Sequence, residues 1–415
     1  MTRRLVLLLN NPFLTDSRSW KIARSASAAG WSVTVVARGG PDLPVTEERD
    51  GFRVLRVPQP AAPRWLPAPP LPDPTAAGLR GPAGYVRDSL GRGLQALRYL
   101  ALTRRWARDI ERAAPDGDLW QAEGLVTLPV ALALARVRGG RVVYDSRDVH
   151  VESGRFARLP PPWKELLRRR ERAWVARADA WITVSEPYAR VLERFLGRPP
   201  AAIVMNCPPA WQRPEPPEPL FHRALGLAPD TRVVLYLGQV VAHRGLEELF
   251  AAIGLVERAV LAVVGVGGGL EHYRALAASL PHAERIHFLP GVAPEAIPAW
   301  TAAADVSAMP VRGSTLNHRL NTPTKLFDAM GAGTPVVASD LPGMAAIVRQ
   351  TGCGVLCDPS DPQDIARAIR DIVDASPERR AAYREACLRA ARERYGWERQ
   401  AGTLLALYGR LVPPG

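Results

Sequence analysis

Two basic residues stand where helices are expected to begin, a position that disfavours a cation. The chain contains 54 Lys and Arg residues, yet only three are lysines, and one of these, Lys325, opens the segment KLFDAMGAGTPVVAS. Thr322 is a candidate N-cap of this helix, and Pro323 suits its first turn. Gly333 suits its end. Because the helix dipole opposes a cation at the N-terminus, an anionic ligand facing both Lys325 and the first backbone N–H groups would resolve the conflict.

A second segment, VVLYLGQVVAHRGLEELFAAI, has the same arrangement. It predicts an apolar strand over 233–237, a turn at Gly238 and a helix from about Gly245, with Arg244 at the helix entrance. In an open α/β sheet, ligands bind at the carboxyl edge, to which both loops lead. Two such sites together suit a diphosphate better than a single phosphate.

Both cations also have a simpler interpretation. Lys325 and Asp328 lie three residues apart and would share one helix face, so they could form a solvated ion pair. Arg244 could be a helix-entry charge in solvent. The apolar neighbours of Lys325, Leu326 and Phe327, and the rarity of lysine in this chain favour the ligand.

The composition favours a globular chain with anionic partners. With 415 residues, 47% hydrophobic and 23% charged, the chain is long enough for two ordinary domains. Its net charge of +13 suits nucleotides, acidic lipid headgroups or nucleic acid. No RNP motif or zinc-finger spacing is present, so we expect no nucleic-acid partner. The absence of a Cys-x-x-Cys pair and of an 18-residue apolar run predicts a cytoplasmic protein without a membrane span.

Strand-like and helical segments alternate along both halves, which predicts an α/β protein with two Rossmann-like domains and parallel sheets. The first domain is expected at 1–205 with a Pro-rich loop at 57–84, a Pro-rich linker at 206–220, the second domain at 221–390, and at 391–415 a C-terminal helix that packs across the domains. The expected strands are RLVLLLN, SVTVVA, FRVLRV, DLWQAE, RVVYDS, AWITVS, AAIVMN, TRVVLYLG, AVLAVVGVGG, RIHFLPG, DVSAMP and PVVAS.

Glycines and polar residues gather at three of the expected strand ends. Gly265-Val-Gly-Gly-Gly resembles a phosphate-binding turn but lacks the spaced GxGxxG pattern of nicotinamide sites, and an ordinary strand-to-helix turn would look the same. Asn317-His318-Arg319 lies in an expected loop that could contact a ligand or simply be surface.

In the first half, YDSRDVHVES places Arg147, Asp148, His150 and Glu152 beyond a strand's carboxyl end. Asp148 and His150 have no second ligand pair at helical spacing, so no metal is expected.

The segment WKELLRRRERAWVARADAW is basic and aromatic. It could lie on an anionic membrane surface, which would make the protein peripheral at the inner membrane face. It could equally be a basic amphipathic helix that packs on the sheet.

With these pieces placed, the chain resembles the retaining glycosyltransferases of the GT-B fold, family 4, over nearly its full length. The second half carries the more specific similarity, in LGQVVAHRGLEELFAAI, VVGVGGG, IHFLPGVAPEAIPAW and PTKLFDAMGAGTPVVASDLPG. The first half is looser, in FLTDSRSWKIARSASAAGWSVTVVA, VVYDSRDV and AWITVSEPYARVL, which are similar to the acceptor-side domain.

The resemblance implies roles for individual residues. Arg244 and Lys325 would hold the donor diphosphate, and Asp328 would contact the ribose. Gly291 and Val292 would lie by the nucleobase. The rest of the expected donor-binding set is Gly238, Gln239, Gly265, Gly267 and Asn317, and the expected acceptor contacts are Asp148 and His150.

The chain departs from the family pattern at three positions. Leu320 stands where the family motif has its first Glu, Gln239 where an Arg usually follows the glycine of the LG turn, and Arg147 where a His is often seen. The first two bear on which sugar is bound.

The resemblance therefore implies transfer of a sugar from a nucleoside diphosphate sugar to a hydroxyl of a glycan, lipid-linked or small-molecule acceptor. It also implies no cofactor, no metal and retention of anomeric configuration. Three other functions stay open: a catalytically silent nucleotide-sugar-binding partner in a glycan-assembly complex, a sugar-nucleotide epimerase, and a nucleic-acid binder that rests on charge alone.

Overall fold

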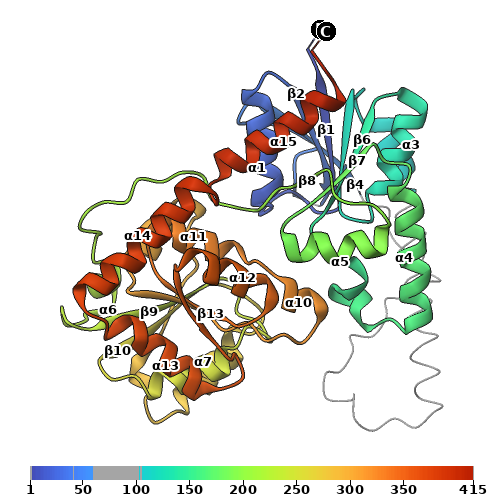
Figure 1. Ribbon diagram of the computed structural model, residues 1–415. Helices are drawn as coiled ribbons and strands as arrows, with labels where there is room; N and C mark the ends of the chain where they lie inside the picture. Colours follow the sequence, from blue (N-terminus) through green and yellow to red (C-terminus); the bar gives the residue numbers. More distant parts are fainter. Residues whose placement is uncertain (1, 41, 59–101, 103–104, 415) are drawn as a thin grey trace. The chain divides into compact units, whose positions relative to one another are not determined.

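The computed structural model describes residues 2–40, 42–58, 102 and 105–414 of the chain. Its contacts divide the chain into two compact units (Figure 1). The first consists of Met1–Val204 together with Ala401–Gly415, and the second of Met205–Gln400.

The first unit is built on an eight-stranded sheet in the order β3-β4-β2-β1-β5-β6-β7-β8. Its strands are β1 (Arg4–Leu9), β2 (Ser32–Gly39), β3 (Thr46–Arg49), β4 (Phe52–Pro58), β5 (Leu119–Glu123), β6 (Arg141–Ser146), β7 (Ala180–Thr183) and β8 (Ala202–Ile203). The pairs are parallel except that β3 runs antiparallel to β4. The sheet is parallel as predicted except at this edge, where the sequence pattern did not predict β3. The sequence of β3, TEER, has no apolar residue to signal a strand, because no residue of this edge strand is buried.

Strand β1 shows why the centre of this sheet is stable. Its neighbours are β2 and β5, and Leu5 is in register with Val33 on one side and Leu119 on the other. Leu5 to Leu9 are all at most 1% exposed, so both faces of the strand are covered. A continuous apolar run of this kind is typical of a parallel strand with helices on both sides.

The helices of the first unit follow the strands in the expected alternation. They are α1 (Ser17–Ala28), α3 (Leu128–Arg138), α4 (Pro161–Val175) and α5 (Glu186–Leu196), with the short turns η2 (His150–Glu152) and η3 (Gly154–Arg158). Residues 105–113 are helical as well. The side chain of Asp16 accepts a hydrogen bond from the N–H of Ser19 and caps α1. Of the Pro-rich loop expected at 57–84, residues 57 and 58 end β4 and the rest lies outside the described residues.

The second unit is built on a six-stranded sheet in the order β11-β10-β9-β12-β13-β14, parallel throughout. Its strands are β9 (Arg232–Leu237), β10 (Ala259–Val264), β11 (Ile286–Leu289), β12 (Val306–Met309), β13 (Val336–Ser339) and β14 (Gly354–Cys357). The sequence pattern did not predict β14, a four-residue edge strand that begins with glycine. The predicted parallel sheet is otherwise what the structure shows.

Strand β9 alternates its side chains between two cores, because successive residues of a strand point to opposite faces. Val234 and Tyr236 belong to a core on one face with residues of α7 and α13. Val233 and Leu235 belong to a core on the other face, with Phe221 of α6. A third core joins β13 to α11, α12 and α14.

Helices surround the sheet of this unit (Figure 1). They are α6 (Leu220–Leu225), α7 (Leu246–Gly254), α8 (Leu270–Ala278), α9 (Ile297–Ala302), α10 (Leu316–Leu320), α11 (Thr324–Ala332), α12 (Pro342–Thr351), α13 (Pro362–Val373) and α14 (Pro377–Glu393), with the turns η4 (Ala283–Arg285) and η5 (Pro294–Ala296). Together they cover both faces of the sheet and leave its strand ends free to carry loops.

The last helix, α15 (Trp397–Leu411), begins in the second unit and continues in the first. Tyr408 is fully buried in the first unit, where its hydroxyl donates a hydrogen bond to Oε1 of Gln121 on β5. Its ring meets Trp31 edge to face with centroids 5.8 Å apart. The end of the chain is therefore part of the first unit's core. The domain boundaries expected from sequence remain predictions.

Candidate functional site

The loop between β9 and α7 carries the first of the two cations. Gly238 leaves β9 with φ +131°, and the carbonyl of Gln239 accepts a hydrogen bond of 2.6 Å from the Tyr236 hydroxyl. Arg244 follows, half-buried, with its Nε atom out of contact with solvent and without a hydrogen-bond partner in the described structure. Helix α7 then begins at Leu246, as predicted, after Gly245 at φ +72°.

Gly245 has a steric reason to be glycine. A Cβ at this position would lie 1.9 Å from the carbonyl oxygen of Pro310, which follows β12. The loop that carries Arg244 is thus pressed against the end of the neighbouring strand. This close approach fixes where α7 begins.

Lys325 stands in the first turn of α11, as predicted. The helix begins one residue later than expected, because Pro323 takes the N-cap position with ψ 143° and Thr324 is the first helical residue. It ends at Gly333 in the left-handed conformation, φ +66°, as predicted. No acidic residue occupies its first turn.

The side chain of Lys325 reaches back to β9. Its Nζ atom lies 4.1 Å from the centroid of the Tyr236 ring, a cation–π contact. Burial and the charge of Arg244 lower the pKa of Lys325 to about 7. The fold has therefore brought two cations together, and no described carboxylate forms an ion pair with either. Such a pair, at two helix N-termini, is arranged for an anion.

The glycine-rich turn after β10 packs directly on the loop after β9. A Cβ on Gly265 would lie 1.8 Å from the Gly238 carbonyl oxygen, and one on Gly267 would lie 2.4 Å from that of Val240. The N–H of Gly269 donates to the same Val240 carbonyl at 3.1 Å. Gly265 and Gly267 lack side chains where the two backbones meet, whereas Val266 between them is exposed.

The remaining predicted donor residues lie in loops or in the helices α10 and α11 of the second unit. Gly291 follows β11, where its added Cβ would be 3.1 Å from Val266, and Val292 is half-buried against the core around β9 and β10. Asp328 is half-buried on α11, one turn after Lys325. Asn317 is buried, and the expected loop around it is instead the short helix α10, capped by Thr315.

A pair of histidines beside this site was missed. His243 has the left-handed φ +66°, and its ring stacks on His318 with centroids 4.1 Å apart and planes 13° apart. Burial, followed by the charges of His318 and Arg244, lowers the pKa of His243 to about 4. His318 Nδ1 also lies 2.8 Å from the Ser314 hydroxyl. Two residues 75 positions apart give no pairing signal in sequence, so only the fold could reveal the stack.

The polar cluster predicted in the first half lies beyond the carboxyl end of β6, as expected. His150 begins the turn η2, and its Nε2 atom accepts a hydrogen bond of 3.1 Å from the N–H of Leu125. Its other ring nitrogen must then carry the proton. The Ser146 hydroxyl donates to the carbonyl of Asp148 at 3.2 Å. Glu152 is held by Lys164 at 2.9 Å and Arg168 at 3.2 Å.

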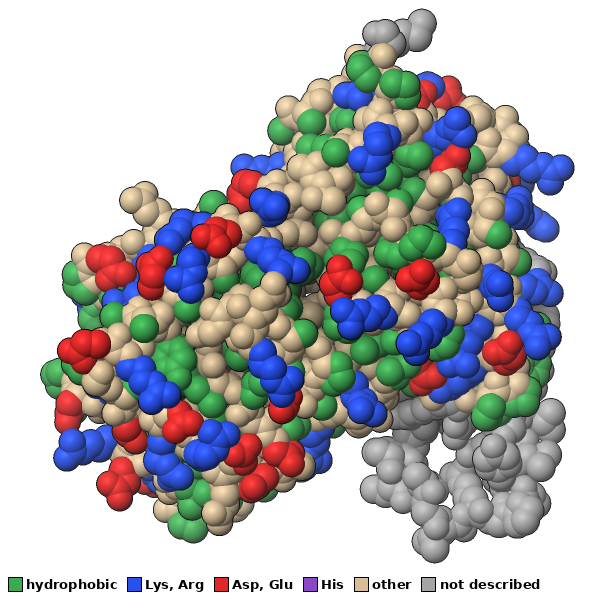
Figure 2. Space-filling model, viewed as in Figure 1, with side chains coloured by type: hydrophobic (Ala, Val, Ile, Leu, Met, Phe, Trp, Pro, Cys, Tyr) green, Lys and Arg blue, Asp and Glu red, His purple; other side chains and the backbone are tan. Residues whose placement is uncertain are grey.

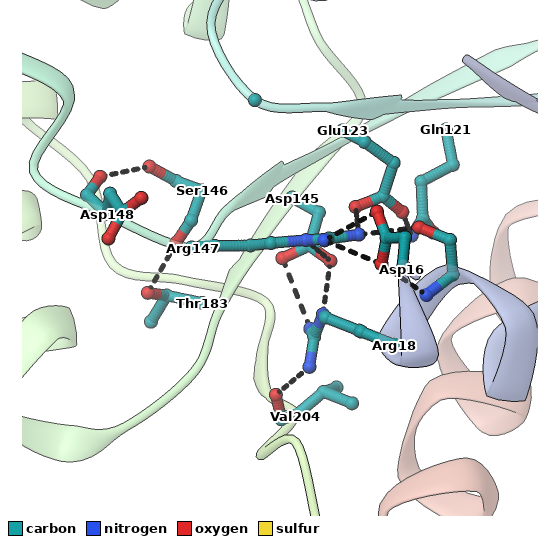
Figure 3. Close-up of polar contacts among 12 residues, drawn as sticks. Asp16, Arg18, Gln121, Glu123, Asp145, Ser146, Arg147, Asp148, Thr183 and Val204 are labelled. Atoms are coloured by element: carbon teal, nitrogen blue, oxygen red, sulfur yellow. Dashed lines mark hydrogen bonds and ion pairs between the residues drawn. The ribbon is translucent and has the colours of Figure 1, made fainter. Parts of the chain in front are cut away.

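A larger charge network lies behind this cluster, and Figure 3 shows its members. Arg18 of α1 is 2% exposed, and its Nε donates to Asp145 Oδ2 at 2.8 Å while its Nη1 donates to the Val204 carbonyl at 2.7 Å. Arg147 lies with one amino group 3.1 Å from both Asp16 carboxylate oxygens, and the other forms an ion pair with Glu123. The network joins α1, β5, β6 and the end of β8.

Charges within this network shift each other's protonation. Burial alone would raise the pKa of Asp16, but Arg147 and hydrogen bonds from Ser19 and Asn11 outweigh it and lower the pKa to about 2. Burial, with the like charges of Asp145 and Asp16, raises the pKa of Glu123. The sequence pattern points to Arg147 but not to Asp16, Arg18, Glu123 and Asp145, because the network draws on three segments that are far apart in the chain, at residues 16–18, 123 and 145–147.

No group of three or more His, Cys, Asp or Glu side chains suited to a metal ion occurs among the described residues. Within the same residues, no helix has the length and apolar character that a membrane span requires.

On the face shown in Figure 2, basic side chains are interspersed with acidic ones. Helix α4 buries only Glu171 and Val175 and exposes Trp163 and Leu166. Its binding to an anionic membrane surface remains a prediction.

Comparisons with known proteins agree with this fold and these motifs. Residues 218–389 match the family model of glycosyl transferases group 1, and residues 16–209 match that of the glycosyl transferase 4-like domain. The structure resembles sucrose-phosphate synthase from Thermosynechococcus elongatus, with a TM-score of 0.71, 19% identity and 99% coverage of both chains. It also resembles HepE of Anabaena in complex with UDP and glucose, with a TM-score of 0.69, 16% identity, and coverage of 99% of this chain and 100% of that one.

These matches define the class as the GT-B glycosyltransferases. The chain belongs to the family of glycosyl transferases group 1. Curated relatives include a D-inositol 3-phosphate glycosyltransferase of Geodermatophilus obscurus, 32% identical over 252 residues, which are 56% of this chain and 53% of the relative. Another, D-inositol 3-phosphate glycosyltransferase 2 of Catenulispora acidiphila, is 30% identical over 250 residues, 57% of either chain. The chain therefore spans little more than half the length of these relatives.

Proposed function

We propose that this protein transfers a sugar from a nucleoside diphosphate sugar to an acceptor hydroxyl, with retention of anomeric configuration and without a metal. The observation that carries the proposal is the pair of Arg244 and Lys325. Each stands at the start of a helix, and the two are close enough that Arg244 contributes to lowering the pKa of Lys325 to about 7. A diphosphate would neutralise both cations and accept hydrogen bonds from the backbone at the helix starts.

The same arrangement supplies the chemistry of transfer. Negative charge accumulates on the departing diphosphate in the transition state, and two fixed cations stabilise it more than they stabilise the bound donor. Lys325 would take up a proton as the diphosphate binds, and so present its full charge when the bond breaks. The departing diphosphate would accept the proton of the acceptor hydroxyl on the same face, so retention needs no separate base here.

The residues around the cations would hold the rest of the donor. The carboxylate of Asp328, one turn after Lys325, offers two acceptor oxygens for a ribose diol. Gly291 and Val292 would lie by the nucleobase. Gly238, Gln239, Gly265 and Gly267 would let the donor approach the backbone, and Asn317 would contact its sugar.

The acceptor would meet the first unit at Asp148 and His150. Because Nε2 of His150 is used by the N–H of Leu125, the protonated Nδ1 is the ring atom left for a ligand. The D-inositol 3-phosphate glycosyltransferases that the chain is similar to make inositol phosphates sensible members of an acceptor panel. The solved structures with UDP make UDP the first nucleotide to test.

The test is calorimetric binding of UDP, GDP and ADP to the wild type and to the variants Arg244→Ala and Lys325→Ala. Arg274→Ala is the matched control, since Arg274 is an exposed cation of the same unit on α8. We expect one diphosphate to bind the wild type and Arg274→Ala alike, and Arg244→Ala and Lys325→Ala to lose that binding. In a separate assay of nucleotide release, each site variant should lose about 10²-fold or more in turnover. Unchanged turnover in both site variants would refute the diphosphate assignment.

Turnover also separates this proposal from a catalytically silent binding partner. That alternative is motivated by Leu320 and Gln239, which replace family residues at the donor site. A silent partner would bind the diphosphate and lose it in Lys325→Ala, yet release no nucleotide from any sugar donor with any acceptor. Release of nucleotide that depends on acceptor would exclude it, and would exclude an epimerase as well.

A further inference from the structure

The second unit contains a second basic hollow, at the opposite edge of its sheet from Arg244 and Lys325. Its volume is about 320 Å³, within the range of small-molecule sites. It is lined by Arg232 at the start of β9, by Asp305 just before β12 and by Pro335 just before β13. These are the amino ends of three adjacent parallel strands. The six residues of β9 separate the two edges by roughly 20 Å.

Four arginines line this hollow against two carboxylates. They are Arg213, Arg232, Arg380 and Arg384, and the carboxylates are Glu218 and Asp305. The carboxylate of Asp305 accepts hydrogen bonds from Arg232 at 3.0 Å and from the N–H of Val233 at 2.9 Å. Glu218 pairs outward with Arg223 at 3.4 Å. Both lining carboxylates therefore already have partners, and neither forms an ion pair with Arg213, Arg380 or Arg384.

In the described chain, the other three arginines have only one carboxylate, that of Glu215, within ion-pair distance. Arg213 pairs with Glu215 at 2.9 Å, while Arg384 reaches the same carboxylate only at 3.9 Å. Arg380 donates Nη1 to the carbonyl of Ala375 at 2.9 Å and has no carboxylate at ion-pair distance in the described chain. Burial, followed by the charge of Arg384, lowers the pKa of Arg213 despite its ion pair with Glu215.

The scaffold of the hollow comes from several elements. Arg380 and Arg384 lie one turn apart on α14, so their side chains share a face. Arg213 comes from the segment before α6, and it donates to the carbonyl of Ala332 at the end of α11. His222 of α6 also lines the hollow, and its Nδ1 is buried without a hydrogen-bond partner among the described residues. Pre-positioned guanidinium groups of this kind suit phosphate, which they can bind through two parallel hydrogen bonds.

We propose that this hollow binds a small phosphorylated anion, held by Arg380 and Arg384 with Arg213 behind them. It is a separate site from the donor site, and it does not depend on the donor proposal. Its occupant would touch Gly333, which ends the helix that Lys325 begins.

The probe is inorganic pyrophosphate, measured by calorimetry at low ionic strength in the Lys325→Ala background, which weakens the donor site. We expect one pyrophosphate to bind, and the further changes Arg380→Ala and Arg384→Ala to weaken it at least tenfold. Arg389→Ala, an exposed arginine of the same helix, should leave it unchanged. Loss of all binding in Lys325→Ala, or equal affinity in the variant lacking Arg380 and Arg384, would overturn the proposal.

Two further measurements test whether weaker pyrophosphate binding comes from loss of the site or from misfolding of the unit. Arg380 also caps α13 through backbone carbonyls, so Arg384→Glu is tested alone, since the side chain of Arg384 pairs only weakly with Glu215. It should abolish pyrophosphate binding in the Lys325→Ala background, and unchanged binding there would count against the site. In the otherwise wild-type protein, UDP affinity should survive Arg384→Glu, which shows that the unit is folded. If UDP fails to bind the wild type while pyrophosphate still needs Arg384, the donor proposal fails and this one stands.

Discussion

The ionisation of Lys325 ties this residue to the ligand it is proposed to hold. Without ligand, burial and Arg244 lower its pKa from 10.5 to about 7. Between these values the unfolded chain binds the extra proton, so the stability of the ligand-free protein should rise with pH through that window. A bound diphosphate reverses the balance, because its negative charge favours the protonated amine.

The first prediction follows from this reversal. Binding of the diphosphate at pH 8 to 9 should take up about one proton, and affinity should fall about tenfold per pH unit above pH 7. Calorimetry in buffers of different ionisation enthalpy measures the uptake directly. Lys325→Arg, which stays charged, should bind with no uptake. A wild type that takes up no proton would show that Lys325 is not in contact with the diphosphate.

Individual residues also show where sequence was informative. Lys325 and Arg244 were recognisable because each breaks a local rule, a cation at a helix start, and broken local rules tend to mark function. The stacked His243 and His318 break no such rule. Their significance comes only from the 4.1 Å between their rings.

At the scale of elements, Arg18 holds α1 against the centre of the first sheet. Its guanidinium bonds Asp145 of β6 and the carbonyl of Val204 just beyond β8, with the two side chains 2% and 0% exposed. Removing Arg18 would leave the buried Asp145 with only Arg147, at 3.7 Å, as a cationic partner, which is costly.

We therefore predict that Arg18→Ala lowers the free energy of unfolding by about 3–5 kcal/mol. Urea unfolding followed by far-UV circular dichroism measures it. The double variant Arg18→Met, Asp145→Leu should recover most of the loss, because neither charge is then buried alone. Arg24→Ala, an exposed arginine of α1, should change stability by less than about 0.5 kcal/mol. Equal effects of Arg18→Ala and Arg24→Ala would show that the buried pair contributes little.

The contact between the loops after β9 and β10 gives a second prediction at this scale. Gly265→Ala would place a Cβ 1.8 Å from the Gly238 carbonyl and push the two loops apart. Gly268→Ala in the same turn meets nothing within 4 Å and is the matched control. A displacement of about 1 Å at a reacting site can reduce a rate about 10²-fold, so Gly265→Ala should lose activity to that extent. Steady-state kinetics that fail to separate the two variants would argue against a donor site built on these loops.

For the whole molecule, the path of the chain has a consequence for its stability. The last residues return to the first unit, where Tyr408 donates its hydroxyl to Gln121 and packs on Trp31. Residues at the end of a chain are often dispensable, but here they fill a core.

Tyr408→Phe should cost about 1–3 kcal/mol, because it leaves the buried Gln121 acceptor without its donor. Truncation after Gln400 should cost more and expose the first unit to proteases while the second unit keeps its protection. Limited proteolysis with peptide mapping distinguishes the two units. Cleavage confined to the second unit would contradict the assignment of α15 to the first core.

The sequence by itself determined that strands and helices alternate in both halves of the chain. It also determined the strands β9 to β13 of the second unit and the helix starts that carry Arg244 and Lys325. These are local signals, because apolar runs, caps and glycines act over a few residues. It could not give β3, which has no apolar residue, or β14, an apolar run of only four residues that begins with glycine. Nor could it give the exact start of α11, where Pro323 takes the N-cap position that Thr322 was expected to provide.

Only the tertiary structure decided which distant residues meet. The network of Asp16, Arg18, Glu123, Asp145 and Arg147 draws on α1 and the ends of two strands, and the arginine hollow draws on β9, α14 and the segment before α6. Long-range contacts depend on how strands are ordered in a sheet and on how closely backbones approach. Strand order and backbone approach cannot be derived from the spacing of residues along the chain, so only the fold shows that these charges lie together.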